Sequence, residues 1–342
     1  DQDSAGDSLK EVLGRRIGKA KSFEVDLGEY KDVNEVLMTG GAEKIVDAIE
    51  RATPLPLAGL NTISTYRDTI QTLYDNGYPK GIQVGLPSLD RLISFNPSNL
   101  VVVTGYPSHG KSELVDEIAI RLAKQGMKTC FASFEKPPQL HALQLASKIV
   151  GKPFFKGKEN RMNQEEMEFA MEFIENNFVF QDHQAGSPFT IEGILDFASS
   201  AILRSNTSVL VIDPFNFIDI KQGNRLLTDA INSMLTKVTQ WAKQTESIVM
   251  FVAHPAKPAN RDNLVATGLD IAGSISWYTK TDFLLSVVRN DSDTDVHVQK
   301  VRWNFQGEQG VAKLKYDLNS GRFDEISEDI GFDTDYEWTT DF

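Results

Sequence analysis

The sequence predicts an α/β fold in which a mostly parallel central sheet is flanked by helices. Three largely apolar runs, at 100–104, 209–213 and 248–254, have the length and composition of strands that are buried on both faces. Longer segments with helical periodicity lie between them, for example at 112–126 and 227–245. This alternation indicates parallel pairing, because two parallel strands need a crossover connection, which is usually a helix.

The first 55 residues predict a small α/β fragment. Residues 8–18 have a helical pattern that ends at a glycine, 21–28 have the pattern of a strand, and 41–52 are helical again. A linker with proline and glycine follows at 53–59.

An amphipathic helix is expected next, at 63–77. Its apolar side chains Ile63, Tyr66, Ile70 and Leu73 fall on one face. An isolated helix of this kind needs another surface on which to bury that face.

The rest of the main domain follows the same alternation. A helix is expected at 189–205, with Thr190 as its N-cap. The segments 296–305 and 311–323 alternate in the manner of a terminal hairpin. Further strands are expected at 128–135 and 281–290, and a further helix at 162–177.

Composition limits the kinds of protein that this chain can be. The 342 residues carry 48 acidic and 35 basic side chains, a net charge of −13, which argues against a general nucleic-acid coat. No apolar run has membrane-spanning length, so no membrane partner is expected. The single cysteine, Cys130, cannot form an internal disulfide and favours a reducing compartment. The last stretch, 324–342, holds eight acids and no Lys or Arg, which predicts a disordered acidic tail.

The segment GYPSHGKS at 105–112 carries the clearest motif. Gly105, Gly110, Lys111 and Ser112 match the pattern G-x-x-x-x-G-K-[ST] of a phosphate-binding loop, with a strand before it and a helix after it. Backbone N–H groups of such a loop, including that of Ser108, surround the phosphates. Lys111 is expected to reach the β- and γ-phosphates and the Ser112 hydroxyl to bind Mg²⁺.

Polar residues end three of the other expected strands. Asp213 closes 209–213 and is a candidate Mg²⁺ ligand, although an isolated Asp there is more often a cap or turn residue. Glu135 closes 128–135 and is a candidate general base, with a solvated residue before a Pro137-Pro138 turn as the alternative. His254 closes 248–254 and is a candidate sensor of the γ-phosphate, although a single His is usually structural.

Two short loops follow Asp213 and His254 and are rich in Gly, Asn and basic residues. Such loops can offer cations and backbone N–H groups to nucleic-acid phosphates, although each alone is an ordinary surface loop. The candidate DNA-binding residues are Lys221, Asn224, Arg225, Lys257, Asn260, Arg261 and Asn263.

The motifs GYPSHGKS, FASFE, VLVIDPFN and FVAHP, in this order, resemble the RecA-like motor domain of DnaB-type hexameric replicative helicases. The similarity covers about 60–323 and is closest to the branch of phage primase-helicases and Twinkle, because DnaB itself has Gln where this chain has His254. It implies a RecA-like P-loop NTPase that hydrolyses ATP or dTTP with Mg²⁺, assembles as a homo-hexamer or a related ring, and unwinds DNA while moving along single-stranded DNA.

The resemblance also assigns roles that the residues alone do not. The element VQKVRW makes Arg302 the arginine finger and Lys300 its neighbour, both offered to the next subunit's nucleotide. Arg289 and Tyr316 match positions that sandwich the base. The helix at 63–77 would pack on the next subunit. The acidic tail ending in Phe342 resembles a docking segment for a replicative DNA polymerase, with single-stranded DNA-binding protein as a further partner.

The start of the chain resembles part of another fold. DQDSAGD looks like the Asp-x-Asp-x-x-Gly element of a TOPRIM primase fold, in which Asp1 and Asp3 would be metal carboxylates. The TOPRIM glutamate is absent, so primase activity is not expected. Asp1 is not a methionine, which predicts that the chain begins inside a longer reading frame.

These expectations give four segments: a partial TOPRIM fragment at 1–55, a linker with the docking helix at 56–80, the motor domain at 81–323 and the acidic tail at 324–342. A phage origin implies the host cytoplasm, and a Twinkle-like origin the mitochondrial matrix. Two alternatives stay open: a recombinase of the RecA/RadA type that forms filaments on DNA, and a scaffold that binds nucleotide without motor activity.

Overall fold

The computed structural model describes residues 9–10, 12–55, 62–157, 159–182, 189–220, 226–256, 265–271, 273 and 275–326. The chain divides into two compact units, Asp1–Pro79 and Lys80–Phe342. None of the described helices is long and apolar enough to cross a membrane.

The first unit is small, and its described residues are mainly helical. Strands β1 (Phe23–Glu24) and β2 (Thr53–Pro54) pair antiparallel, and α2 (Val33–Glu50) runs between them. The helix expected at 41–52 is therefore too short: α2 begins after Asp32, whose side chain accepts a hydrogen bond from the Glu35 N–H. Gly41, with φ of 78°, introduces a kink that divides α2 into two pieces.

The amphipathic helix of the first unit also differs from the expectation. Ile63–Tyr66 form a 3-10 turn and α3 spans Arg67–Asn76, where Gly77 ends it with φ of 71°. Of its predicted apolar face, Ile63 is 75% exposed and Ile70 is 46% exposed. This face is therefore largely uncovered by the described residues.

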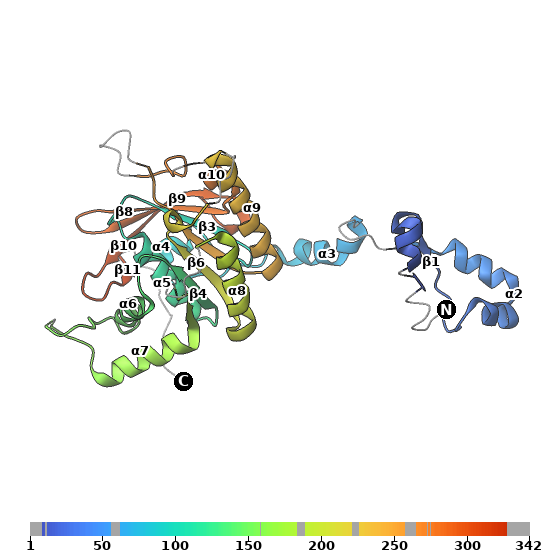
Figure 1. Ribbon diagram of the computed structural model, residues 1–342, viewed down its shortest axis with the longest axis horizontal. Helices are drawn as coiled ribbons and strands as arrows, with labels where there is room; N and C mark the ends of the chain where they lie inside the picture. Colours follow the sequence, from blue (N-terminus) through green and yellow to red (C-terminus); the bar gives the residue numbers. More distant parts are fainter. Residues whose placement is uncertain are drawn as a thin grey trace. The chain divides into compact units, whose positions relative to one another are not determined.

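A nine-stranded sheet forms the centre of the second unit as described, in the order β11-β10-β9-β8-β3-β7-β6-β4-β5 (Figure 1). The pairs from β8 to β5 are parallel, and β9, β10 and β11 extend the sheet antiparallel. This confirms the predicted mostly parallel sheet and the terminal hairpin. The strands are β3 (Leu100–Thr104), β4 (Lys128–Ser133), β5 (Phe178–Phe180), β6 (Thr207–Asp213), β7 (Ile248–Val252), β8 (Phe283–Arg289), β9 (Thr294–Val301), β10 (Gly310–Tyr316) and β11 (Phe323–Glu325).

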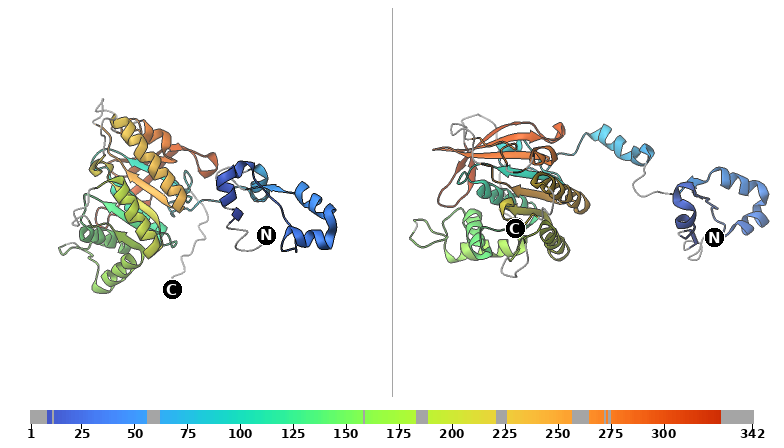
Figure 2. Two further views of the ribbon diagram at one scale, coloured as in Figure 1. Left: turned by 45° about the vertical axis from the view of Figure 1, so that its right-hand side comes forward. Right: turned by 45° about the horizontal axis from the view of Figure 1, so that its top comes forward.

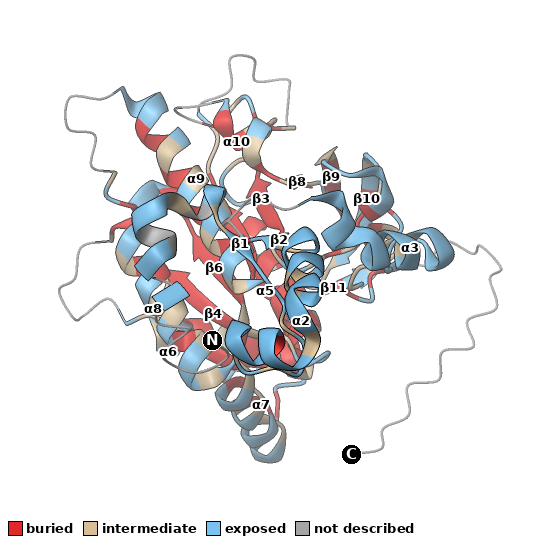
Figure 3. Ribbon diagram, turned by 90° about the vertical axis from the view of Figure 1, so that its right-hand side faces the viewer, coloured by how far each residue is buried: buried red, intermediate tan, exposed pale blue. Residues whose placement is uncertain are grey.

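Helices cover both faces of this sheet (Figure 1 and Figure 2). One core lies between the sheet and α5 (Lys111–Ala123), α6 (Pro138–Val150) and α7 (Gln164–Asn177). The other lies between the sheet and α8 (Ile191–Ser205), α9 (Leu227–Thr245) and α10 (Ser276–Lys280). A four-residue helix, α4 (Pro87–Asp90), packs against β10. All five residues of β3 are buried, as Figure 3 shows for the sheet interior, which explains why its first four residues are all apolar.

Local signals explain the starts of three helices. Thr190 caps α8 by accepting a hydrogen bond from the Gly193 N–H, as predicted. Asn163 and Glu166 form a reciprocal capping box at the start of α7. The Pro137-Pro138 pair, interpreted from the sequence as a turn, instead begins α6 with Pro138 in the first turn, where the missing N–H costs nothing.

The predicted start of the acidic tail needs a correction. Asp324 and Glu325 belong to strand β11 and pair with Lys315 and Leu314 of β10. The Glu325 carboxylate accepts hydrogen bonds from the Ser88 N–H and hydroxyl, both at 2.9 Å. The sheet therefore extends to Glu325, and the rest of the predicted tail, from 327, lies outside the described residues.

Candidate nucleotide-hydrolysis site

The loop that joins β3 to α5 has the backbone of a phosphate cradle. Gly105 and Gly110 have φ of 142° and 91°, and Ser108 has φ of 66°. A Cβ on Gly105 would lie 2.5 Å from the Val287 carbonyl oxygen, so only glycine fits at that position. Lys111 is the first residue of α5 and donates to the Tyr106 carbonyl at 2.9 Å. The loop thus places backbone N–H groups at a helix N-terminus, which favours an anion.

Lys111 lies in an unusual electrostatic environment. Only 4% of the residue is exposed, and this burial lowers its pKa to about 8. The negative charges of Asp213 and Glu135 oppose that shift. A desolvated cation beside two carboxylates is well suited to attract the phosphates and metal of a nucleotide.

Asp213 ends β6 and is hydrogen-bonded to Ser112. Burial raises the pKa of Asp213 to about 6, the largest effect at this carboxyl, and the Ser112 hydrogen bond opposes it. Its buried Oδ1 atom has no hydrogen-bond partner among the described residues. A buried carboxylate oxygen that accepts no hydrogen bond and lies beside a hydroxyl is a suitable ligand for Mg²⁺. This ion prefers oxygen ligands and commonly takes phosphate and water oxygens as its remaining ligands. The described residues contain no cluster of three or more His, Cys, Asp or Glu that would bind a metal without the nucleotide.

Glu135 and His254 meet at the same edge of the sheet. Both lie two residues beyond the ends of their strands, β4 and β7, rather than at the last strand position. His254 Nε2 lies 3.8 Å from Glu135 Oε1, and the backbone N–H of His254 donates to Asn216 Oδ1 at 3.3 Å. Burial, followed by the charge of Lys111, lowers the pKa of His254. A neutral imidazole beside a half-exposed carboxylate can relay hydrogen bonds between a terminal phosphate and a water molecule.

Arg289 and Tyr316 also lie together, next to the loop. The Arg289 guanidinium carbon is 4.1 Å from the centre of the Tyr316 ring. A Cβ on Gly110 would lie 3.8 Å from Arg289 and from Phe323. The two residues predicted to hold the base therefore stack on each other beside the phosphate-binding loop.

Arg302 and Lys300 lie at the opposite edge of the sheet. Arg302 forms an ion pair with Asp282 at 2.6 Å, and Asp282 accepts from the Leu100 N–H at the start of β3. The guanidinium also donates to the carbonyls of Thr279, Lys280 and Thr281, and the Lys300 ammonium to those of Tyr278 and Thr279. Lys111 lies beyond the other end of β3, whose five residues span about 13 Å. Arg302 therefore cannot reach the phosphate-binding loop of its own chain.

Several predicted residues lie outside the described part of the chain. They are the candidate DNA-binding residues Lys221, Asn224, Arg225, Lys257, Asn260, Arg261 and Asn263, and the acids Asp1 and Asp3.

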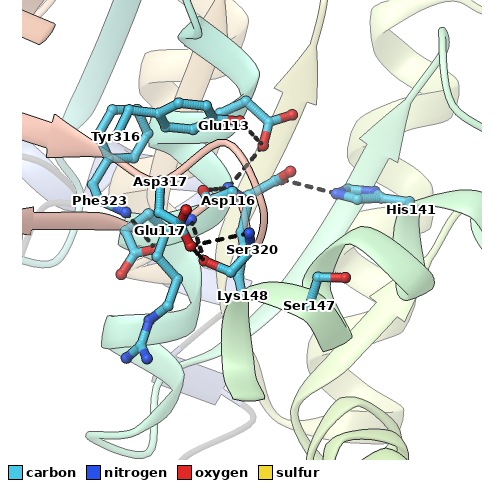
Figure 4. A network of polar contacts seen from close by, with 12 residues as sticks. Glu113, Asp116, Glu117, His141, Ser147, Lys148, Tyr316, Asp317, Ser320 and Phe323 are labelled. Atoms are coloured by element: carbon cyan, nitrogen blue, oxygen red, sulfur yellow. Dashed lines mark hydrogen bonds and ion pairs between the residues drawn. The ribbon is translucent and has the colours of Figure 1, made fainter. Parts of the chain in front are cut away.

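Sequence reasoning missed a network of charged side chains on α5 and α6 (Figure 4). Asp116 accepts a hydrogen bond from His141 at 2.8 Å and pairs with Lys136 at 3.3 Å, and although burial opposes it, these two neighbours hold the pKa of Asp116 well below its usual range. Glu113 pairs with Lys148 at 2.7 Å. The acids at 113 and 116 share a face of α5 at i, i+3 spacing, which was the one available signal.

Known proteins are similar to this chain at two levels: a family model matches the second unit, and a curated relative aligns with most of the chain. The model of the DnaB-like helicase C terminal domain matches residues 81–325. The Twinkle homolog protein, chloroplastic/mitochondrial, of Arabidopsis thaliana is 33% identical over 344 aligned residues, which cover 94% of this chain and 48% of that protein. The chain thus spans about half the length of this curated relative.

Two solved structures share the fold. The ATPase domain of G40P superimposes with a TM-score of 0.68 at 16% identity, covering 78% of this chain and all of that one. A DnaB-like replicative helicase, whose structure was described with its interactions with primase, gives a TM-score of 0.66 at 13% identity, covering 95% of this chain and 75% of that one. At these identities the likeness supports the architecture alone.

Proposed function

Because the chain belongs to the family of DnaB-like helicase C-terminal domains, we propose that it is the motor of a ring-shaped replicative DNA helicase. It hydrolyses ATP or dTTP with Mg²⁺, moves along single-stranded DNA and separates the strands of a duplex at a fork.

One observation supports this proposal above the others: the residues predicted to form the two halves of a catalytic site lie at opposite edges of one sheet. Lys111, Asp213 and Glu135 gather beyond the carboxyl end of β3. Arg302 lies beyond the amino end of the same strand, clasped by Asp282. A head-to-tail assembly brings these two edges together between neighbouring copies, and such an assembly closes into a ring when its rotation permits.

The residues then divide the chemistry. Lys111 and the loop N–H groups bind the phosphates, while Ser112 and Asp213 would hold Mg²⁺, which neutralises charge on the phosphate oxygens. Glu135 orients the attacking water and accepts its proton. His254 contacts the terminal phosphate and links its presence to Glu135. Arg302 of the neighbouring copy stabilises the charge of the transition state.

DNA binding is proposed for the loops after Asp213 and His254. The chain is acidic overall, so the attraction for DNA must be local, and the basic residues of 221–225 and 257–263 provide it. Because both loops follow residues of the hydrolysis site, nucleotide turnover could shift them along one strand. The acidic tail is proposed to bind the replicative polymerase and single-stranded DNA-binding protein, and α3 to dock on the next copy.

The compartment is part of the same proposal. The free, buried Cys130 suits a reducing environment such as a bacterial cytoplasm. The relative named as chloroplastic/mitochondrial keeps an organellar matrix as the alternative.

A forked-duplex unwinding assay, run beside NTPase assays with and without single-stranded DNA, tests the proposal. The expected result is nucleotide-dependent unwinding and DNA-stimulated hydrolysis, both lost in Lys111→Ala. A scaffold that only binds nucleotide would show no stimulation by DNA. A filament-forming recombinase would appear as open filaments rather than closed rings in electron micrographs, and would exchange strands without unwinding a fork.

A further inference from the structure

The strongest feature outside the predicted site is the carboxylate of Glu113, which contacts two distant parts of the chain (Figure 4). Glu113 follows Ser112 directly on α5. Its Oε2 atom lies 2.7 Å from the Lys148 ammonium of α6 and accepts from the Tyr316 hydroxyl of β10 at 3.4 Å. The helix that begins at the phosphate-binding loop is thereby tied to a residue predicted to contact the base.

Lys148 links Glu113 to the turn between β10 and β11. Its side chain is 1% exposed and also donates to the Gly321 carbonyl in the turn between β10 and β11. The ammonium lies 5.8 Å from the centre of the Tyr316 ring and 5.9 Å from that of Phe323. The ion pair, the side-chain hydrogen bond and the ring contacts of this buried cation are thus with Glu113 or with the hairpin that carries Tyr316, and its charge also acts on Asp116.

A side chain at position 321 in the turn would crowd this ion pair. Gly321 has φ of 76°, and a Cβ there would lie 3.1 Å from the Lys148 ammonium and 3.3 Å from Glu113 Oε2. The hairpin therefore approaches the pair as closely as its backbone allows.

An ion pair between the buried Lys148 and the partly buried Glu113 contributes more to placement than to stability. Removing two charges from water costs several kcal/mol, which roughly offsets their attraction, so an apolar pair of the same volume would hold the helices together equally well. What the charges add is direction, since Glu113 fixes where the Tyr316 hydroxyl points. Burial, followed by the charge of Glu113, raises the pKa of Tyr316, so its hydroxyl stays protonated and able to donate.

We propose that Glu113, held by Lys148, is a positioning residue that fixes the Tyr316 ring for stacking on the base of a bound nucleotide. The Glu113–Lys148 pair thereby joins the Tyr316 ring, which recognises the base, to the same rigid unit as the phosphate-binding loop. This inference rests on the proposed function, because it needs a nucleotide in that loop and its base at Arg289 and Tyr316.

Calorimetric titration with Mg²⁺-ADP and with Mg²⁺-pyrophosphate separates the base from the phosphates. Glu113→Gln and Lys148→Met are each expected to weaken ADP binding by about 5- to 20-fold, comparable to the loss of one ordinary hydrogen bond. Pyrophosphate binding should stay within about twofold of wild type. Lys152→Met is the matched control, because Lys152 pairs with Glu166 at the surface and touches neither Glu113 nor Tyr316.

A double-mutant cycle shows whether Glu113 acts through the hydroxyl of Tyr316. Tyr316→Phe keeps the ring and removes the hydroxyl, so Glu113→Gln should cost little further ADP affinity in that background. The double variant Glu113→Gln/Lys148→Met leaves no unpaired buried charge and keeps the test valid if a single variant unfolds.

Two results would overturn the inference: equal losses of ADP and pyrophosphate affinity, or additive effects in the cycle. A wild-type protein that bound neither ligand would instead overturn the nucleotide site itself, and this role of Glu113 with it.

Discussion

Replacing Arg302 with alanine separates catalysis in trans from a purely structural role of this residue. In a ring, the guanidinium would be supplied to the neighbouring nucleotide, and such a group raises turnover by ~10³–10⁵. The corresponding loss of transition-state stabilisation is about 4–7 kcal/mol. Nucleotide binding should persist, because Lys111, Ser112 and Asp213 lie at the other edge of the sheet.

Arg302 also supports the fold, and that contribution must be measured beside the rate. It pairs with Asp282 and donates to three carbonyls at the end of α10. The side chain is 33% exposed, so its loss is expected to cost about 1–3 kcal/mol of stability, or about 2–10 °C in Tm. A folded Arg302→Ala protein at 25 °C is therefore expected.

Asp282→Asn is the matched control for this experiment. It weakens the same ion pair but leaves the guanidinium in the chain, so it should lower Tm while keeping most of the turnover. Steady-state hydrolysis, nucleotide titration and thermal melts of the two variants give the answer. Normal hydrolysis by Arg302→Ala, or equal inactivation by Asp282→Asn, would refute a catalytic role for Arg302.

Three further predictions concern the residues around the phosphates. Asp213→Asn should stabilise the metal-free protein at pH 8 by about 1–3 kcal/mol, because the folded-state pKa of Asp213, about 6, lies above the unfolded value and makes the ionised carboxyl destabilising above pH 6. In thermal melts with chelator this gain in stability should fade towards pH 4. A gain that does not depend on pH would contradict a raised pKa of Asp213. In denaturant titrations, Gly105→Ala should lower the free energy of unfolding by about 2–4 kcal/mol, because the added Cβ would collide with the Val287 carbonyl oxygen. Gly126→Ala, where the added Cβ would meet open space, should lower it by about 1 kcal/mol. Glu135→Gln should keep Mg²⁺-nucleotide affinity and lower turnover by ~10²–10⁴, and unchanged turnover would exclude it as general base.

The sequence was sufficient for those parts of the fold in which local pattern and burial agree. The strand at 100–104 is apolar at its first four positions because both of its faces are covered, and the phosphate-binding motif follows it directly. Thr190 caps α8 through contacts three residues apart. Such features depend on neighbours in the chain, so a single sequence contains the information.

Other features depend on partners far along the chain. The start of α6 was mistaken for a turn because two adjacent prolines suit both a turn and a first helical turn, and only packing on the sheet decides between them. Tyr316 and Glu113 are 203 positions apart, and Lys148 and Gly321 are 173 apart, so no spacing rule connects them. The contacts that hold Arg302 likewise come from residues near the ends of three different strands. Its carbonyl acceptors are backbone groups, so no residue type in the sequence indicates them.

Turnover per chain, measured as the protein is diluted while its mass distribution is followed in the same samples, tests the central claim most directly. If each nucleotide is cleaved between two copies, activity per chain will fall in step with the assembled fraction and single-stranded DNA will raise it only where assemblies exist. Monomers that hydrolyse nucleotide at the full rate, whether or not DNA is present, would contradict the account.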